Sequence, residues 1–190
     1  EEGRRQILAI HTSTVQLASD VDLGLIAQIT AGFSGADLAN IVDEAALLAV
    51  RSGREAVTMG DFDLAIERVV AGLQRKITLK SELKRRVAYH EGGHALVAQL
   101  QPDTDPVHKV SIIPTAKGAL GYTLQMPEED IYLMSKRELE ERLAVMLGGR
   151  AAELLVFNDT STGAANDLEV ATALARRMVT EFGMTEALGP

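Results

Sequence analysis

The sequence contains no cysteine, and this absence limits the metal chemistry that the chain can carry. Without thiols the chain can form neither a disulfide nor a thiolate metal site, so a bound metal must take its ligands from His, Asp or Glu. The sequence also lacks the roughly 18–20 consecutive apolar residues that a membrane-spanning helix needs. Its first residues form a charged helical pattern, which differs from the basic and then apolar pattern of a signal segment.

An excess of positive charge is absent as well. The formal net charge is −8 at pH 7, and no basic arm or face stands out. Binding to a phosphate backbone needs clustered Lys and Arg, so we expect no nucleic-acid partner. The 190 residues are 46% hydrophobic and 24% charged. These values are typical of a globular chain with room for one large domain or two small ones.

Four short amphipathic helices are predicted in the first part of the chain, and their short connections favour a small bundle. They cover residues 2–13, 22–30, 34–49 and 58–69. The third and fourth begin with an N-cap residue that is followed by an acid three positions later. These pairs are Ser34 with Asp37, and Thr58 with Asp61.

The second part is predicted to be α-rich with a small β-sheet, after a junction at residues 71–80. A long helix begins near Ser81 and ends before Pro102, because proline cannot continue it. Two β-rich segments are expected to form an antiparallel pair. A helix with a break or bend at its two glycines follows, and then a last helix. The strands are residues 107–114 and 120–126, and the helices are 135–147, resuming through 155, and 164–182.

His90 and His94 lie four residues apart in the long helix, so both imidazoles share one helix face. One Zn²⁺ can accept a nitrogen from each at about 2.0–2.1 Å. Glu91 lies beside them, where it can take a proton from a metal-bound water that attacks a carbonyl carbon. The pattern predicts a zinc peptidase site. The alternative is two histidines that serve only the structure of an ordinary helix, whose predicted packing face is Leu83, Val87, Val97 and Leu100.

Two adjacent glycines, Gly92 and Gly93, lie between these histidines. Each costs roughly 0.5–1 kcal/mol relative to alanine inside a helix. Their presence indicates that something approaches this backbone closely, either at the site or as a tightly packed neighbouring helix.

Catalytic zinc takes three protein ligands and keeps one open position. Asp167 is a candidate third ligand, because it lies on the apolar stripe of the last helix. A place in the first turn, where Asp favours the helix N-terminus, explains it equally well. Glu153 is the rival ligand. His11 and His108 are too weakly marked to be assigned as ligands.

Six blocks in the chain together resemble the FtsH-type ATP-dependent zinc metalloproteases. In order, these are GFSGADLAN at 32–40, AYHEGGHA at 88–95, DPVHKV at 105–110, GGRAAE at 148–153, STGAANDL at 161–168 and FGM at 182–184. The resemblance implies a four-helix AAA lid bundle over residues 1–77, followed by an α-rich zinc metallopeptidase domain over 78–190. It also implies that His90, His94 and Asp167 bind zinc, that Glu91 is the catalytic base, and that Asp167 is preferred over Glu153.

The same resemblance implies a membrane-anchored homohexamer. Its ATPase ring unfolds damaged membrane and cytosolic proteins and passes them to the peptidase sites. The implied location is the cell inner membrane with the peptidase on the cytoplasmic side, or an organellar membrane. The strand at 120–126 would border the cleft and could pair with an extended substrate.

In the lid, the resemblance places Ile7, His11, Gly35 and Ala36 against the adenine and ribose of ATP. The alternative is that these four residues serve only helix packing and capping. Ala36 stands where many AAA proteins carry an arginine that reaches the phosphates.

The sequence departs from the whole-protein pattern at both ends. It contains no Gly-x-x-x-x-Gly-Lys-Ser/Thr segment. ATP and Mg²⁺ are therefore expected to bind mainly to an ATPase subdomain outside these residues, as are the membrane spans and the last peptidase helices. One alternative is a non-proteolytic AAA chaperone or assembly module with an inactive peptidase site, although His90, Glu91 and His94 are all intact. A stand-alone zinc peptidase such as a small aspzincin is disfavoured by the lid blocks.

Overall fold

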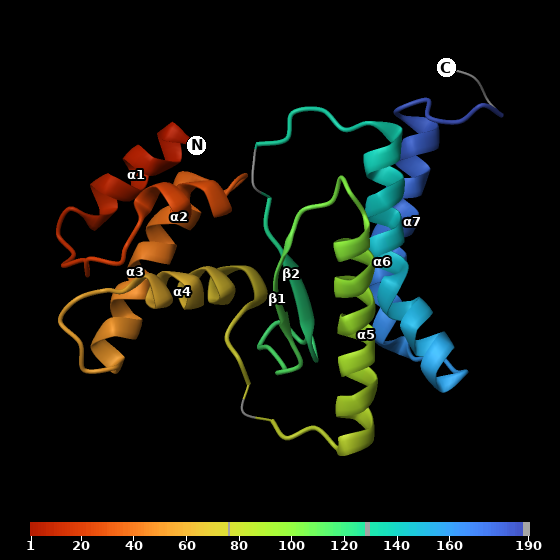
Figure 1. The fold of residues 1–190 in the computed structure, drawn as a ribbon, viewed down its shortest axis with the longest axis horizontal. Coiled ribbons are helices and arrows are strands. Elements are labelled where there is room, and N and C mark those ends of the chain that lie inside the picture. Colours follow the sequence, from red (N-terminus) through yellow and green to blue (C-terminus); the bar gives the residue numbers. More distant parts are fainter. Residues whose placement is uncertain (76, 128–129, 188–190) are drawn as a thin grey trace. The chain divides into compact units, whose positions relative to one another are not determined.

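The computed structural model describes residues 1–75, 77–127 and 130–187, and it is mainly helical with one small sheet (Figure 1). Two compact units are described separately. One comprises Glu1–Arg75, Thr115–Ala119 and Met126–Asp130, and the other Lys76–Pro114, Leu120–Gln125 and Ile131–Pro190. Residue 76 of the predicted junction and residues 188–190 of the predicted peptidase domain lie outside the described residues. The domain boundary between 77 and 78 stays a prediction.

The first unit contains the four predicted helices. They are α1 (Glu2–Thr12), α2 (Leu23–Ile29), α3 (Gly35–Arg51) and α4 (Met59–Ala71). Helix α3 packs against both α1 and α4. Apolar side chains from all four helices form the core, since such residues recur at helical spacing and are removed from water here. The largest fully buried ones are Leu8, Ile26, Leu38, Ile41, Phe62 and Ile66.

Both predicted capping patterns are present in this unit. The Ser34 hydroxyl accepts a hydrogen bond from the Asp37 amide at 3.3 Å, and the Asp37 carboxylate accepts one from the Ser34 amide at 2.9 Å. At α4, the Asp61 carboxylate accepts from the Thr58 amide at 2.9 Å. These bonds satisfy amides that would otherwise lack a partner at the helix starts.

The second unit contains three long helices and the sheet. Its helices are α5 (Ser81–Leu100), α6 (Lys136–Phe157), the short 3₁₀ helix η1 (Thr162–Ala164) and α7 (Ala165–Thr180). The strands are β1 (Val107–Ser111) and β2 (Tyr122–Gln125). They pair antiparallel as expected, with Ser111 opposite Tyr122, but both are shorter than predicted.

Helix α6 runs without interruption through Gly148 and Gly149, so the predicted break there is wrong. The reason is its packing against α5. A Cβ atom on Gly148 would lie 2.7 Å from the carbonyl oxygen of Gly93. Glycine is required because the two helix backbones touch at this crossing, and burial in the packed interface outweighs the low helix propensity of glycine. Helices α5, α6 and α7 lie side by side (Figure 1).

The buried face of α5 also differs from the predicted one. Leu83 and Leu100 are 39% and 73% exposed, so these two assignments are wrong. The helix instead buries its polar motif, together with two apolar residues. The buried set is Val87, His90, Glu91, Gly93, His94 and Ala98. Buried polar groups need partners, and Glu153, the Val145 carbonyl and Thr123 supply them to His90, His94 and Glu91. Among the described residues, no helix combines the length and the apolar character needed to cross a membrane.

Candidate metal centre

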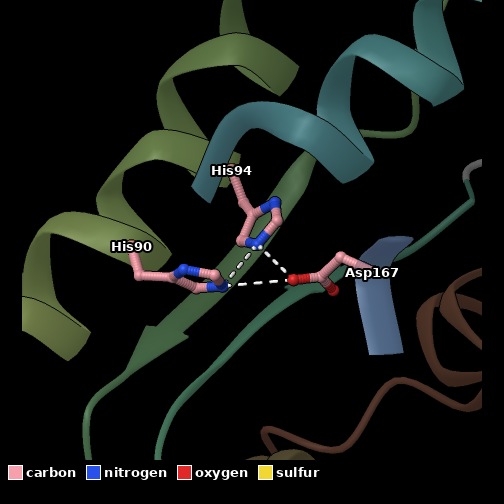
Figure 2. A group of neighbouring side chains, drawn as sticks. All are labelled: His90, His94 and Asp167. Carbon is pink, nitrogen blue, oxygen red and sulfur yellow. Dashed lines mark hydrogen bonds and ion pairs between the residues drawn. The ribbon is translucent and has the colours of Figure 1, made fainter. Parts of the chain in front are cut away.

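Three side chains from two helices converge on one point in the second unit (Figure 2). His90 and His94 project from neighbouring turns of α5, and Asp167 projects from the first turn of α7. The two Nε2 atoms lie 3.1 Å apart. Oδ2 of Asp167 lies 3.2 Å from Nε2 of His90 and 3.5 Å from Nε2 of His94. Both histidines are buried and Asp167 is half-buried.

The other nitrogen of each imidazole has a hydrogen-bond acceptor. Nδ1 of His94 lies 2.7 Å from the carbonyl oxygen of Val145, and Nδ1 of His90 lies 2.8 Å from Oε1 of Glu153. A carbonyl and a carboxylate only accept, so each Nδ1 carries the hydrogen and donates. Each neutral ring therefore presents the lone pair of Nε2 to the cluster. Two such lone pairs and a carboxylate oxygen facing one another can together bind a cation.

The distances fit a zinc ion. Three ligand atoms at about 2.0–2.1 Å from a tetrahedral zinc lie about 3.3–3.4 Å from one another. The observed separations of 3.1, 3.2 and 3.5 Å bracket that value. Two imidazoles and one carboxylate are a protein ligand set that catalytic zinc uses, and a hydrogen-bonded Nδ1 is the usual way to orient a histidine ligand.

Electrostatics within the cluster also favour a cation. The Asp167 carboxylate is the main cause that raises the pKa of His90, and Glu153 adds to it. Burial works to lower the pKa of His94, but Asp167 and the Val145 carbonyl together raise it. Burial works to raise the pKa of Asp167, but the two imidazoles bring it well below its ordinary value. The site thus stabilises positive charge. Either protons on the imidazole nitrogens or a bound metal ion can supply that charge.

Glu153 is not a member of this cluster, although it was the rival ligand in the sequence. Its carboxylate is fully buried behind His90 and accepts from the ring at Nδ1. It also accepts from Arg86 at 3.1 Å, from the Ser161 amide at 2.9 Å and from the Ser161 hydroxyl at 3.1 Å. Burial works to raise the pKa of Glu153, but these donors together lower it. Glu153 therefore fixes the orientation of His90 as an ionised acceptor.

The orienting partners Val145, Arg86 and Ser161 were not predicted from the sequence. The sequence did contain a pattern that indicates Val145. Val145, Gly149 and Glu153 follow one another at intervals of four residues, so they lie on one face of α6. Gly149 on this face leaves room for the rings. A Cβ atom there would lie 2.5 Å from Nε2 of His94.

The paired glycines of α5 have different surroundings. A Cβ atom on Gly93 would lie 2.4 Å from the carbonyl oxygen of Gly148, so the close approach is that of a neighbouring helix. A Cβ atom on Gly92 would meet nothing within 4 Å. Only Gly93 is required by packing.

Glu91 lies one residue after His90 and is buried, with 7% of its surface exposed. Its Oε2 accepts a hydrogen bond from the Thr123 hydroxyl at 3.0 Å. Burial is the main cause that raises the pKa of Glu91, and the Thr123 bond opposes it. A carboxylate with a raised pKa takes up a proton more readily than an exposed one, as a general base must.

The remaining residues that the sequence singled out lie outside this cluster. His108 is exposed on β1. In the first unit, Ile7 and Gly35 lie close together, since a Cβ atom on Gly35 would be 3.8 Å from Cδ1 of Ile7. His11 and Ala36 are exposed in that unit.

Comparison with known sequences places this geometry in a family. A family model for peptidase family M41 matches residues 77–190, and one for the AAA+ lid domain matches residues 20–64. The chain is 57% identical over 189 residues to the ATP-dependent zinc metalloprotease FtsH of Thermotoga maritima. It is 60% and 56% identical over 189 residues to the proteins of the same name from Methylibium petroleiphilum and Acaryochloris marina.

These alignments cover 99% of this chain and 31%, 31% and 29% of the three relatives. The chain thus spans about three tenths of the length of the curated relatives it matches. The M41 match covers the whole α5–α7 region that builds the metal centre. The chain therefore belongs to peptidase family M41.

Proposed function

We propose that this chain is the lid and peptidase segment of an ATP-dependent zinc metalloendopeptidase, which hydrolyses peptide bonds within proteins. One observation carries the proposal. Two Nε2 lone pairs and one carboxylate oxygen converge at 3.1–3.5 Å, next to a buried glutamate. Such a set of groups suits metal-assisted hydrolysis. The family match and the names of the relatives support the same reaction class.

In this proposal His90, His94 and Asp167 hold Zn²⁺, which when bound polarises a carbonyl oxygen and lowers the pKa of a coordinated water to around 7. Glu91 accepts the proton of the attacking water at its carboxylate and passes it to the leaving amine. Glu153 keeps the His90 ring in the tautomer and orientation that present Nε2.

We also propose that β2 borders the substrate. It lies next to Glu91 through Thr123, and an extended peptide can add to a strand by main-chain hydrogen bonds. Leu124→Pro removes one main-chain donor of this strand. Loss of peptide cleavage at unchanged zinc content would support the role, and unchanged cleavage would contradict it.

The proposal for the first unit is that Ile7, His11, Gly35 and Ala36 contact the adenine and ribose of ATP, with Mg²⁺ and the phosphates held mainly outside these 190 residues. The AAA+ lid match, over residues 20–64, supports this for Gly35 and Ala36. The proximity of Ile7 and Gly35 agrees with it. We further propose that the whole protein is a homohexamer that degrades unfolded or damaged proteins. Its proposed place is the inner membrane of a cell, or an organellar membrane, with the peptidase on the cytoplasmic side.

Cleavage of an unstructured reporter peptide by the zinc-loaded whole protein, with the peptidase helices that are expected outside these residues, tests the enzymatic role. We expect cleavage by the wild type and its loss in Glu91→Gln at unchanged zinc content. Glu82→Gln, an exposed acid on the same helix, should cleave like the wild type. A zinc-loaded wild type that cleaves no peptide would favour the non-proteolytic chaperone or assembly module. Cleavage by Glu91→Gln at the wild-type rate would contradict the role of Glu91.

A further inference from the structure

Thr123 of β2 reaches across to the helix that carries the zinc-binding motif. Its hydroxyl oxygen lies 3.0 Å from Oε2 of Glu91 and 2.9 Å from the main-chain oxygen of the same residue. In the described part of the chain, this hydroxyl is the one hydrogen-bond donor to the Glu91 carboxylate. The orientation of that carboxylate therefore depends on a single neighbouring side chain.

The backbone just before β2 holds the rest of the Glu91 side chain. A Cβ atom on Gly121 would lie 2.9 Å from Cγ of Glu91, 2.7 Å from Cγ1 of Val87 and 2.7 Å from the carbonyl oxygen of Ser111. Residues 121 and 123 share one face of an extended strand, because side chains alternate. Gly121 thus lets the chain pass close to the methylene groups of Glu91, and Thr123 then bonds its carboxylate.

We propose that Thr123 is a positioning residue that orients the Glu91 carboxylate toward the His90, His94 and Asp167 cluster. The inference rests on the proposed function, since it assigns Glu91 as the base. A glutamate side chain has three rotatable bonds, and fixing it in one rotamer costs conformational freedom. A hydrogen bond to an ionised acceptor is stronger than one between neutral groups, so the Thr123 hydroxyl can hold the Glu91 carboxylate in one rotamer.

A second acceptor lies close to the Thr123 hydroxyl. It is the main-chain oxygen of Glu91, 2.9 Å away. The hydroxyl therefore lies against both the carboxylate and the main chain of Glu91, where a hydroxyl can donate a hydrogen bond and a methyl group cannot.

The test compares Thr123→Val, which keeps the shape and loses the hydroxyl, with Thr123→Ser, which keeps the hydroxyl. Thr104→Val is the matched control, because the Thr104 hydroxyl also bonds a carbonyl of α5, that of Ala98 at 2.9 Å, and bonds no carboxylate among the described residues. Zinc content, kcat and KM for a reporter peptide are measured for all four zinc-loaded proteins. We expect kcat to fall about 10–100-fold in Thr123→Val with KM and zinc content unchanged, as for other residues that orient a metal site. Thr123→Ser and Thr104→Val should retain the wild-type kcat.

Crystal structures of the zinc-loaded wild type and Thr123→Val give a readout that needs no activity. We expect the Glu91 carboxylate to face the metal in the wild type and to occupy other rotamers in Thr123→Val. An unchanged Glu91 rotamer in Thr123→Val would overturn the inference, as would an unchanged kcat. Absence of zinc-dependent cleavage in the wild type would instead refute the proposed function.

Discussion

A Cβ atom placed on Gly93 would lie 2.4 Å from the carbonyl oxygen of Gly148, so α5 and α6 cross with their backbones in contact. This contact has a direct consequence for the metal centre. It brings the carbonyl of Val145 and the carboxylate of Glu153 within 2.7 and 2.8 Å of the two histidine Nδ1 atoms. The close crossing of α5 and α6 therefore also determines how the two histidine rings are oriented.

Gly93→Ala should damage both stability and zinc binding. The added methyl would meet backbone, which cannot move aside as a flexible side chain can, and overpacking of this kind costs about 1–3 kcal/mol or more. Gly92→Ala is the matched control. Its methyl enters open space, and alanine favours a helix interior by roughly 0.5–1 kcal/mol, so this variant should be more stable than the wild type. Thermal unfolding and zinc content measure both effects. Equal stability of the two variants would contradict the close crossing.

Glu153→Gln should weaken zinc binding without abolishing it. The variant removes the negative charge that holds the Nδ1 hydrogen of His90 but leaves every proposed ligand in place, and such changes typically cost 10–100-fold in metal affinity. A chelator competition titration measures the dissociation constant. Glu140→Gln, an exposed position on the same helix, should bind zinc like the wild type. Complete loss of zinc in Glu153→Gln would show that Glu153 itself is a ligand.

Asp61→Asn should destabilise the first unit at neutral pH by about 1–3 kcal/mol, because Asp61 both caps α4 and pairs with Arg54 at 2.7 Å. The Arg54 guanidinium is the main cause that holds the pKa of the buried Asp61 carboxyl well below its ordinary value. A lowered pKa gives stability that is fully present above about pH 4, the ordinary range of Asp, and is lost as the pH falls toward the folded-state value.

The unfolding free energies of the wild type and Asp61→Asn should therefore differ at pH 7 and converge in acid. Asp43→Asn, at an exposed position on α3, should match the wild type throughout. A constant difference between the wild type and Asp61→Asn from pH 7 down to pH 2 would contradict the ionised pair.

The sequence predicted those parts of the fold that depend on local patterns. The capping pairs Ser34–Asp37 and Thr58–Asp61 mark the starts of α3 and α4, and helical apolar spacing marks the bundle. Local reasoning failed at the crossing of α5 and α6. Helix propensity alone favours a break at Gly148, and only contact with a segment 55 residues earlier keeps the helix continuous.

At the candidate site, too, the sequence predicted what depends on spacing within one helix and did not predict what depends on packing between helices. The spacing of His90 and His94 is local, and the sequence predicted their shared face. Whether Asp167 or Glu153 joins them depends on how α6 and α7 pack, which spacing within one helix does not specify. Only the resemblance favoured Asp167 before the structure brought its Oδ2 atom within 3.2 Å of His90.

Zinc content per chain, measured by elemental analysis, tests the central claim most directly. The wild type, Asp167→Ala and the control Glu169→Gln, an exposed acid two positions later on α7, are compared after loading and removal of free metal. We predict about one zinc per folded chain in the wild type and in Glu169→Gln, and a strong loss in Asp167→Ala. A folded wild type without zinc, or an Asp167→Ala variant that retains it fully, would contradict the assignment of His90, His94 and Asp167 as the metal centre.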